Sequence, residues 1–495
     1  MSRWRRDPLS LRQLPLRGGA GRVPMAVTRE RLTRALAPKV VAVIGDKKAS
    51  GYNWLRSMKE FDGPVYSVQV DENEIAGIEE LGIPNYKSLT DIPDQVDFAV
   101  CAVPRQVAPF IVQGCVEANV GGVTLFTSGF AETGEDIGVE LQNKIFEIAD
   151  PAGLALIGPN CMGLHVPGLG VRFNRDQPAG VQGNIGFVSQ SGTHGMNFSL
   201  TGAAQGLYCS TLVSFGNGII LEAADYLEYL ADDPQTEVIG MYIEGARDGQ
   251  RLFRTLREVA ARKPVIIWKG GQTEGGGRAI SSHTASLASD QAIWEAMITQ
   301  VGAVAVHNLD EMIDVVKATL LTKRTQGNRL GLIAMTGGQS VVLTDAFEKA
   351  GWKVPTLSDE SYAQLSEFFN IIGGSYRNPL DAAGTIGQDP KHLDTIFDIL
   401  NADENIDAVG MELSATFMAR RWQDKPEEFD RLIGSLKRFM AESDKPFLAA
   451  LHPSHVEEAA LTARKRLQEE GIATFPSFER AANALRKASA LAAVS

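Results

Sequence analysis

One segment, KGGQTEGGGRAISSHTASLASDQAIWEAM at residues 269–297, places a histidine within a stretch rich in glycine and hydroxyl side chains. His283 stands between Ser282 and Thr284. A neutral imidazole is a good nucleophile and is largely unprotonated near pH 7. The neighbouring hydroxyls would bind phosphoryl oxygens, and a polar loop of this length is rarely filler. The residues alone leave a solvated surface histidine as the alternative.

A second type of candidate site is a turn of glycine and hydroxyl residues between a strand and a helix. This pattern occurs twice, as NIGFVSQSGTHGMNFSLTGAAQG at 184–206 and as RLGLIAMTGGQSVVLTDAFEKAG at 329–351. Two more pairs follow in the same order, VIGMYIEGA with AVGMELSAT and KPVIIWKGG with KPFLAALHP. The pattern predicts one fold present twice. Each copy would present free backbone N–H groups at a helix start, where anions bind.

The chain from residue 40 must provide the remaining framework. Short apolar runs such as VVAVIG, PVYSVQV and VDFAVCAVP alternate with helical patterns, which predicts a parallel sheet with right-handed crossovers. The first strand ends at Gly45, where a doubly wound sheet holds a phosphorylated cofactor. The Gly-x-Gly-x-x-Gly fingerprint is absent, so the pattern gives little support to a plain dinucleotide site.

Charge and composition exclude several classes of function. The 48 Lys and Arg against 60 Asp and Glu give a net charge of −12, which repels nucleic acid and anionic membranes. No apolar run approaches the length of a membrane-spanning helix. The 4 cysteines form neither a Cys-x-x-Cys pair nor a Cys/His cluster, so we expect no disulfide, no metal site and a cytoplasmic location.

The first 24 residues are rich in arginine and contain one acidic residue. They lack the continuous apolar stretch of a secretory signal. We expect a disordered, dispensable extension, with Met25 as an alternative start; an organelle transit peptide is the other interpretation.

At the histidine segment the sequence resembles the phosphohistidine loop of the nucleoside-diphosphate-forming acyl-CoA synthetases, relatives of succinyl-CoA synthetase. Further motifs fall in that family's order from about residue 35 to the C-terminus: VVAVIGD, VDFAVCAVP, TSGFAE, GPNCMGL, FVSQSGTHG, YLADDPQTEVIGMYIEGARDG, MTGGQS, NPLDAAG and FPSFERAANAL. The arrangement is similar to that of the α subunit of the ADP-forming acetyl-CoA synthetases. The resemblance implies an α/β protein with a Rossmann-like CoA-binding domain and two flavodoxin-like domains, divided as 1–30 (extension), 31–168, 169–325 and 326–495.

The resemblance also implies roles for individual residues. His283 would take a phosphoryl group from an acyl phosphate and pass it to a nucleoside diphosphate. Glu244 would orient that histidine and stabilise its charged form, whereas the equivalent position of the second copy is Ser414. The implied phosphate-binding residues are Ser191, Gly192, Thr193, Gly337, Gly338, Gln339 and Ser340. The implied CoA-binding residues are Gly45, Ser50, Gly51, Val103, Pro104, Thr127 and Ser128.

Some features depart from the family. The first loop reads Gly45-Asp46-Lys47-Lys48-Ala49-Ser50-Gly51 instead of Gly-Ala-Ser followed by Pro and Gly, and His194 follows the first turn without an assigned role. No ATP-grasp region is visible in the sequence. The resemblance therefore implies a hetero-oligomer in which ATP or ADP and Mg bind an ATP-grasp partner chain. This chain would bind phosphate and either acyl-CoA or the carboxylic acid. A non-catalytic acyl-CoA sensor or scaffold and an NAD-dependent oxidoreductase are the alternatives.

Overall fold

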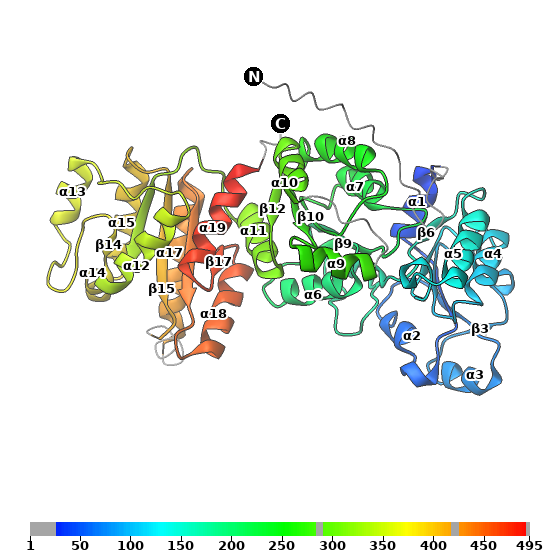
Figure 1. Cartoon of the computed structure of the whole chain (residues 1–495). Helices are drawn as coiled ribbons and strands as arrows, with labels where there is room; N and C mark the ends of the chain where they lie inside the picture. Colours follow the sequence, from blue (N-terminus) through cyan, green and yellow to red (C-terminus); the bar gives the residue numbers. More distant parts are fainter. Residues whose placement is uncertain (1–25, 284–290, 417–424, 492–495) are drawn as a thin grey trace, which may run out of the picture.

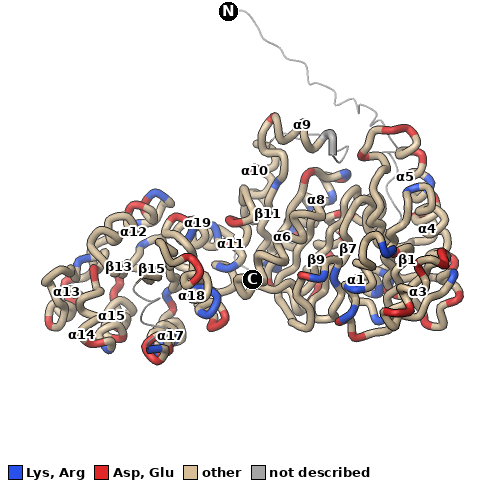
Figure 2. The backbone as a smooth tube through the Cα atoms, turned by 90° about the horizontal axis from the view of Figure 1, so that it is seen from below, with Lys and Arg blue, Asp and Glu red and all other residues tan. Residues whose placement is uncertain are grey.

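The protein forms three α/β units in a row, with the first and third at opposite ends (Figure 1). The computed structural model describes residues 26–283, 291–416 and 425–491, without the side chains of residues 281–283. Of the extension predicted over residues 1–30, residues 1–25 lie outside the described part, and the first helix begins at Arg29, within the predicted extension. Acidic and basic residues are interspersed along all three units (Figure 2).

The first unit contains a six-stranded parallel sheet. Its strand order is β3-β2-β1-β4-β5-β6, so the order reverses between β1 and β4. The strands are β1 (Val41–Ile44), β2 (Val65–Val68), β3 (Asn85–Tyr86), β4 (Phe98–Cys101), β5 (Gly122–Leu125) and β6 (Ala155–Ile157). The helices are α1 (Arg29–Leu36), α2 (Asn53–Ser57), α3 (Glu72–Glu79), α4 (Ala108–Glu117) and α5 (Asp136–Ala149). This is the predicted parallel series.

The second unit has the strand order β12-β11-β10-β8-β9-β7, in which only β7 is antiparallel to its neighbour. The strands are β7 (Gly163–His165), β8 (Ile185–Ser189), β9 (Cys209–Ser214), β10 (Val238–Ile243), β11 (Val265–Lys269) and β12 (Val304–Val306). The helices are α6 (Gly192–Ala203), α7 (Ala223–Asp232), α8 (Gly249–Ala260), α9 (Glu274–His283), α10 (Gln291–Gln300) and α11 (Leu309–Leu321). The chain thus enters the second sheet at β7, before the predicted boundary at residue 168.

The third unit repeats the second. Its strand order β14-β13-β15-β16-β17 matches β9-β8-β10-β11-β12 of the second sheet strand for strand. The strands are β13 (Leu330–Ala334), β14 (Leu380–Asp381), β15 (Ala408–Ser414), β16 (Phe447–His452) and β17 (Thr474–Phe475). The helices are α12 (Gly337–Lys349), α13 (Asp359–Ser366), α14 (Ala383–Gln388), α15 (Lys391–Ala402), α17 (Pro426–Glu442), α18 (Glu457–Glu469) and α19 (Phe478–Ala490). The predicted duplication is confirmed by this order.

The glycine-rich segment after β11 contains a helix, so the prediction of one long loop is wrong there. The Thr273 hydroxyl accepts a hydrogen bond from the Gly276 N–H at 3.1 Å and begins α9. Ile280 is buried in the middle of the helix. An N-terminal cap and a buried anchor together outweigh the low helix propensity of glycine, about 1 kcal/mol per residue.

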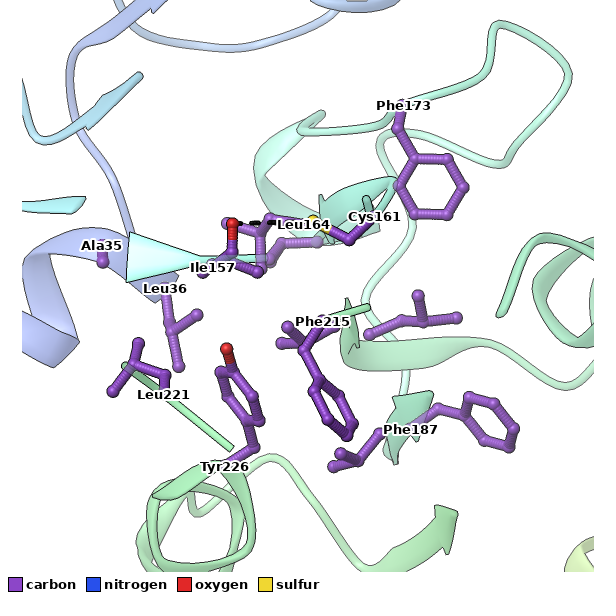
Figure 3. Packing of buried hydrophobic residues seen from close by; sticks show 14 of the residues in the cluster. Ala35, Leu36, Ile157, Cys161, Leu164, Phe173, Phe187, Phe215, Leu221 and Tyr226 are labelled. Carbon is purple, nitrogen blue, oxygen red and sulfur yellow. Dashed lines mark hydrogen bonds between the residues drawn. The ribbon is translucent and has the colours of Figure 1, made fainter. Parts of the chain in front are cut away.

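The first and second units share one apolar core. Leu36 and Ile157 of the first unit belong to the same cluster of buried residues as Phe215, Leu221 and Tyr226 of the second. Figure 3 shows the Tyr226 ring pointing toward Leu36 and Ile157. Apolar burial of this kind holds the two units as one body, because separating them would expose the shared surface to water.

The second and third units meet through α11 and α19, which lie side by side (Figure 1). Asp314 on α11 is 2% exposed and accepts two hydrogen bonds from the Arg480 guanidinium on α19. Lys317, fully buried, donates to Gln205 Oε1 at 2.8 Å and to the Thr474 carbonyl at 3.0 Å. Burial lowers the pKa of Lys317 to about 8. The contacts of Asp314 with Arg480 and of Lys317 with Thr474 cross the joint, and buried polar contacts of this kind specify how the units join.

Arg480→Met should destabilise the protein by about 3 kcal/mol, because it removes the guanidinium that pairs with the buried Asp314 carboxylate. Urea unfolding of the full chain measures this free energy. The control is Arg486→Met, which replaces an exposed arginine on the same helix and should change the stability by less than about 0.5 kcal/mol. Equal stability of the two variants would contradict the structural importance of the Asp314 pair.

Candidate functional site

The predicted CoA-binding residues gather at the carboxyl edge of the first sheet. Gly45, Val103 and Thr127 follow β1, β4 and β5, which are neighbours in the sheet. The Thr127 hydroxyl donates a hydrogen bond to the Val103 carbonyl at 2.5 Å. Gly45 has φ +77°, and a Cβ on it would lie 2.5 Å from Val103 Cγ1. The backbone after β1 therefore needs glycine for both its conformation and its close approach to β4.

The rest of this group lies on the open side of the same edge. Ser50, Gly51, Pro104 and Ser128 are exposed. The unusual Asp46 is 3% exposed, accepts from the Ser50 hydroxyl at 2.9 Å and accepts from the Leu55 N–H at 2.9 Å. Asp46 therefore holds the loop between β1 and α2 in one shape. The edge sits at the reversal of strand order, where open α/β sheets bind ligands.

An aromatic residue at this edge was missed by the sequence analysis. Phe126 directly follows β5, remains 42% exposed and contacts Trp54 edge-to-face at 5.0 Å between ring centroids. An exposed aromatic ring at a ligand-binding edge can pack against a flat ring of a ligand. The sequence could have indicated Phe126 as a binding residue, because it comes immediately before the predicted CoA-binding residue Thr127.

In the second unit the first glycine turn forms the start of α6. The Ser191 hydroxyl caps the helix by accepting from the His194 N–H at 3.4 Å. Gly192 and Thr193 form the first helical positions, and a Cβ on Gly192 would lie 2.6 Å from Met162 Cγ. Free N–H groups and the positive end of the helix dipole make this turn suitable for an anion.

Glu244 lies beside that helix start, at the end of β10. It is 9% exposed, and its Oε1 accepts a hydrogen bond from the Tyr242 hydroxyl at 3.1 Å. The Gln190 side chain binds the backbone here, because its Oε1 accepts from the N–H groups of Glu244 and Gly245 at 2.8 and 3.1 Å. The other carboxylate oxygen, Oε2, is buried and has no hydrogen-bond partner among the residues that the structure describes. A buried carboxylate oxygen in this condition is ready to accept from an incoming N–H group.

His283 is the last residue of α9. Its side chain lies outside the described part, so a contact with Glu244 stays a prediction. The chain nevertheless links His283 to the site. Lys269 is the last residue of β11, which pairs with β10, and α9 begins five residues later.

Two further residues beside Glu244 were also missed. Lys269 is buried, its ammonium donates to the Gly270 carbonyl, and it lies 5.4 Å from the centre of the Trp294 ring. Burial lowers the pKa of Lys269, and the charge of Glu244 opposes that effect. Tyr242 is the second, and only its position beside the carboxylate distinguishes it from an ordinary core tyrosine. The lysine that ends an otherwise apolar strand was a usable signal in the sequence.

The second glycine turn lies in the third unit, at the start of α12. The Thr336 hydroxyl caps this helix by accepting from the Gln339 N–H at 3.2 Å. Gly337, Gly338, Gln339 and Ser340 follow in its first turn, where Asp381 Oδ2 lies 3.2 Å from the position of a Cβ on Gly337. Burial raises the pKa of Asp381. A neighbouring carboxylate weakens anion binding at a helix start.

The helices that carry the two glycine turns, α6 and α12, lie on opposite sides of the joint between α11 and α19 (Figure 1). In Figures 1 and 2, α11 and α19 lie between α6 and α12. No hydrogen bond or ion pair joins the starts within residues 26–283, 291–416 and 425–491. A joint phosphate site therefore stays a prediction.

The described residues contain neither a metal-type cluster of side chains nor a membrane-spanning helix. No group of three or more His, Cys, Asp or Glu side chains there has the arrangement of a metal site. None of the helices in that part combines the length and apolar character needed to cross a membrane. All four cysteines are buried thiols.

Two family profiles match the chain. The profile described as a CoA binding domain matches residues 39–167, and that of the succinyl-CoA ligase-like flavodoxin domain matches residues 182–319. These ranges contain the first sheet and most of the second. The mostly parallel α/β fold predicted from the sequence is confirmed.

Relatives cover almost the whole chain. The α subunit of acetate–CoA ligase [ADP-forming] II from Pyrococcus furiosus is 33% identical over 90% of this chain and 93% of the relative. Acetate–CoA ligase [ADP-forming] I from Archaeoglobus fulgidus is 34% identical over 78% of this chain, which spans only 55% of that longer relative. Among solved structures, acetyl-coenzyme A synthetase 1 of Ca. Korarchaeum cryptofilum in complex with phosphate and ADP matches with a TM-score of 0.78 and 27% identity. That match covers 93% of this chain and 96% of the other.

Gly45→Ala should weaken the binding of CoA about tenfold or more, because the new Cβ would push the end of β1 away from Val103 and strain a residue at positive φ. Isothermal titration of the full chain with CoA measures the dissociation constant. Gly153→Ala is the control, since Gly153 has φ +58° but open space around a Cβ. Equal effects of the two substitutions would contradict a CoA site at this edge.

Proposed function

Because the chain belongs to the family of ADP-forming acetate–CoA ligases, we propose that it is the CoA-binding, phosphohistidine-bearing subunit of an acyl-CoA synthetase. The enzyme interconverts acyl-CoA, ADP and phosphate with a carboxylic acid, CoA and ATP. One observation carries the proposal. Within the described part of the chain, the buried Glu244 keeps one carboxylate oxygen without a hydrogen-bond partner, beside the capped start of α6.

The first chemical step joins phosphate to the acyl group. Bound CoA reaches from the edge around Gly45 and Thr127, and phosphate binds the N–H groups at the start of α6. A phosphate oxygen attacks the thioester carbonyl carbon, the carbon–sulfur bond breaks, and the CoA thiol leaves as an acyl phosphate forms. The helix start stabilises the negative charge that gathers on the phosphate.

The second step transfers the phosphoryl group to the protein. An imidazole nitrogen of His283 attacks phosphorus, and the bond to the acyl oxygen breaks, so the carboxylate leaves. The imidazole becomes positively charged as it reacts, and the free oxygen of Glu244 accepts its other N–H. The phosphohistidine then donates the phosphoryl group to ADP, which restores the neutral ring.

We assign the nucleotide step to a second chain. This chain spans only 55% of the longer Archaeoglobus relative, whereas the Pyrococcus relative of matching length is named as an α subunit. We therefore propose a hetero-oligomer in the cytoplasm, with ADP or ATP and Mg on an ATP-grasp partner. In this proposal the site around Glu244 serves acyl and phosphoryl transfer and the partner chain binds the nucleotide, so the two halves of the reaction occur at separate places.

Labelling tests the proposed function directly. The full chain incubated with acetyl-CoA and radioactive phosphate should gain a label that is acid-labile and base-stable, and His283→Ala should gain none. His392→Ala is the control, because this half-buried histidine belongs to the third unit and its substitution should leave the label intact. A label that persists in His283→Ala would overturn the assignment. Absence of any label in the natural chain, with CoA still bound, would instead favour an acyl-CoA sensor.

Glu244→Gln should slow His283 phosphorylation about 10²-fold, because the amide keeps the shape and loses the charge that stabilises the imidazolium. Single-turnover labelling gives the rate. The control Asp407→Asn removes another partly buried carboxylate, one that pairs with Arg329 before β15, and should not change the rate. Matching rates for Glu244→Gln and the natural chain would make Glu244 structural.

A further inference from the structure

The third unit contains an apolar cavity near the carboxyl edge of its sheet. The cavity measures about 120 Å³ and lies between β15 and the helices α14, α15 and α17. Three of its lining residues, Leu393, Met411 and Leu413, are only 2–3% exposed and belong to the hydrophobic core of this unit. Met335 and Ile386 also line the cavity and pack against the same core. The inner part of the cavity is therefore hydrophobic.

The size of the cavity limits what it can hold. Apolar cavities of this kind stay dry, and one of about 150 Å³ holds a benzene molecule. In proportion, this cavity accommodates an apolar group of about four or five carbon atoms. Met335 and Met411 are flexible thioethers, which adapt to the shape of a bound molecule. The cavity therefore fits a short aliphatic chain.

One wall of the cavity carries polar groups, and this wall is α17. Arg431 and Ser435 both line the cavity and lie four residues apart on one face of the helix. Ser435 is 7% exposed, and its hydroxyl makes no hydrogen bond to any residue that the structure describes. Buried hydroxyl groups normally have a hydrogen-bond partner. The Ser435 hydroxyl is therefore available as a donor to a molecule in the cavity.

The charge beside the cavity that has no protein partner is positive. Arg431 is exposed where it borders the cavity, and within the described ranges it takes part in no ion pair. Glu428, the neighbouring acidic residue, is paired, since its Oε1 lies 3.5 Å from Lys425 Nζ. A carboxylate accepts hydrogen bonds from both a guanidinium and a hydroxyl. The polar wall thus has the chemistry that recognises a carboxylate.

The comparison of the two repeats supports this assignment. The pairing registers align Glu244 of β10 with Ser414 of β15, and Ser414 lines the cavity. An acidic side chain at this strand end would repel a bound carboxylate. The third unit has a neutral residue there, so the end of its strand is compatible with an anionic molecule.

We propose that the third unit binds a short-chain carboxylic acid as its carboxylate, with an aliphatic chain of about four carbon atoms in the cavity and the carboxylate on Arg431 and Ser435. This inference goes beyond the proposed function, because it requires neither CoA nor phosphorylation. Every group that it uses belongs to the third unit, whereas Gly45 and Glu244 belong to the first and second. No covalent bond forms or breaks at this site.

Isothermal titration of the full chain with isovalerate tests the proposal, because its isobutyl chain matches the cavity. The alcohol 3-methylbutanol has the same chain without the charge and should bind about tenfold more weakly. Arg431→Gln should weaken the binding of isovalerate about tenfold and leave that of 3-methylbutanol unchanged. The matched control Arg486→Gln replaces an exposed arginine on α19 and should change neither dissociation constant.

Ser435→Leu provides a second variant, since its larger apolar side chain takes up space in the cavity. It should abolish measurable binding of isovalerate and leave the dissociation constant for CoA unchanged. Unchanged isovalerate binding in both Ser435→Leu and Arg431→Gln would mean that the acid binds elsewhere, and would overturn the proposal. Equal affinities of the natural chain for isovalerate and 3-methylbutanol would overturn the assignment of a carboxylate, and no binding of isovalerate would overturn the site. These titrations do not depend on the labelling of His283, so a failure of the proposed function is distinguishable from a failure of this inference.

Discussion

Buried parallel strands impose one constraint on which the rest of the structure depends. Each strand must be followed by a crossover, so the turns that leave parallel strands lie at the same edge of their sheet. In the first unit this constraint brings Gly45, Val103 and Thr127 together, although they are far apart in the sequence. In the second unit it brings Glu244 beside the start of α6. The sheet topology therefore decides where the candidate site residues lie, and the loops adjust only their local geometry.

Much of the fold could be predicted because buried strands are nearly uninterrupted apolar runs. The internal repeat added the strand order, since three ordered matches in sequence correspond to the matching orders of the second and third sheets. The helix α9 could not be predicted in the same way. Its glycines argue against a helix, and only the Thr273 cap and the buried Ile280 show why one forms.

The sequence predicted the charged and phosphate-binding residues of the candidate site. It did not predict the neighbouring side chains that hold those residues in position. Within VIGMYI, a tyrosine is an ordinary residue of a buried strand. Its role emerges only from the register, which places Tyr242 opposite Trp268 and two residues before Glu244. Gln190 is similar, because its amide binds the backbone of a strand that follows more than fifty residues later.

The two repeats use the same strand ends differently. The pairing registers align Gly240 with Gly410, and so Tyr242 with Glu412 and Glu244 with Ser414. In the third unit the Glu412 carboxylate accepts from the Met335 N–H at 2.8 Å, which turns the carboxylate inward to support its own backbone. In the second unit the carboxylate is that of Glu244, two residues further along the aligned strand. It lies at the carboxyl edge of the second sheet. We therefore propose that one copy of the duplicated framework is reactive and that the other is structural.

The joint between the second and third units has a consequence for how such proteins are assembled from genes. Among the residues that the structure describes, no strand pairing crosses it, and α11 contacts the third unit through the ion pair of Asp314 with Arg480 and the hydrogen bond from Lys317 to the Thr474 carbonyl. Recognition across this joint is encoded in side chains and needs no peptide bond between residues 321 and 330. The third unit could therefore be encoded elsewhere, on another polypeptide or in another order, and still find its place. Any such rearrangement must keep the apolar packing of this joint, because Ala318 of α11 belongs to the same buried cluster as Ala481 and Leu485 of α19.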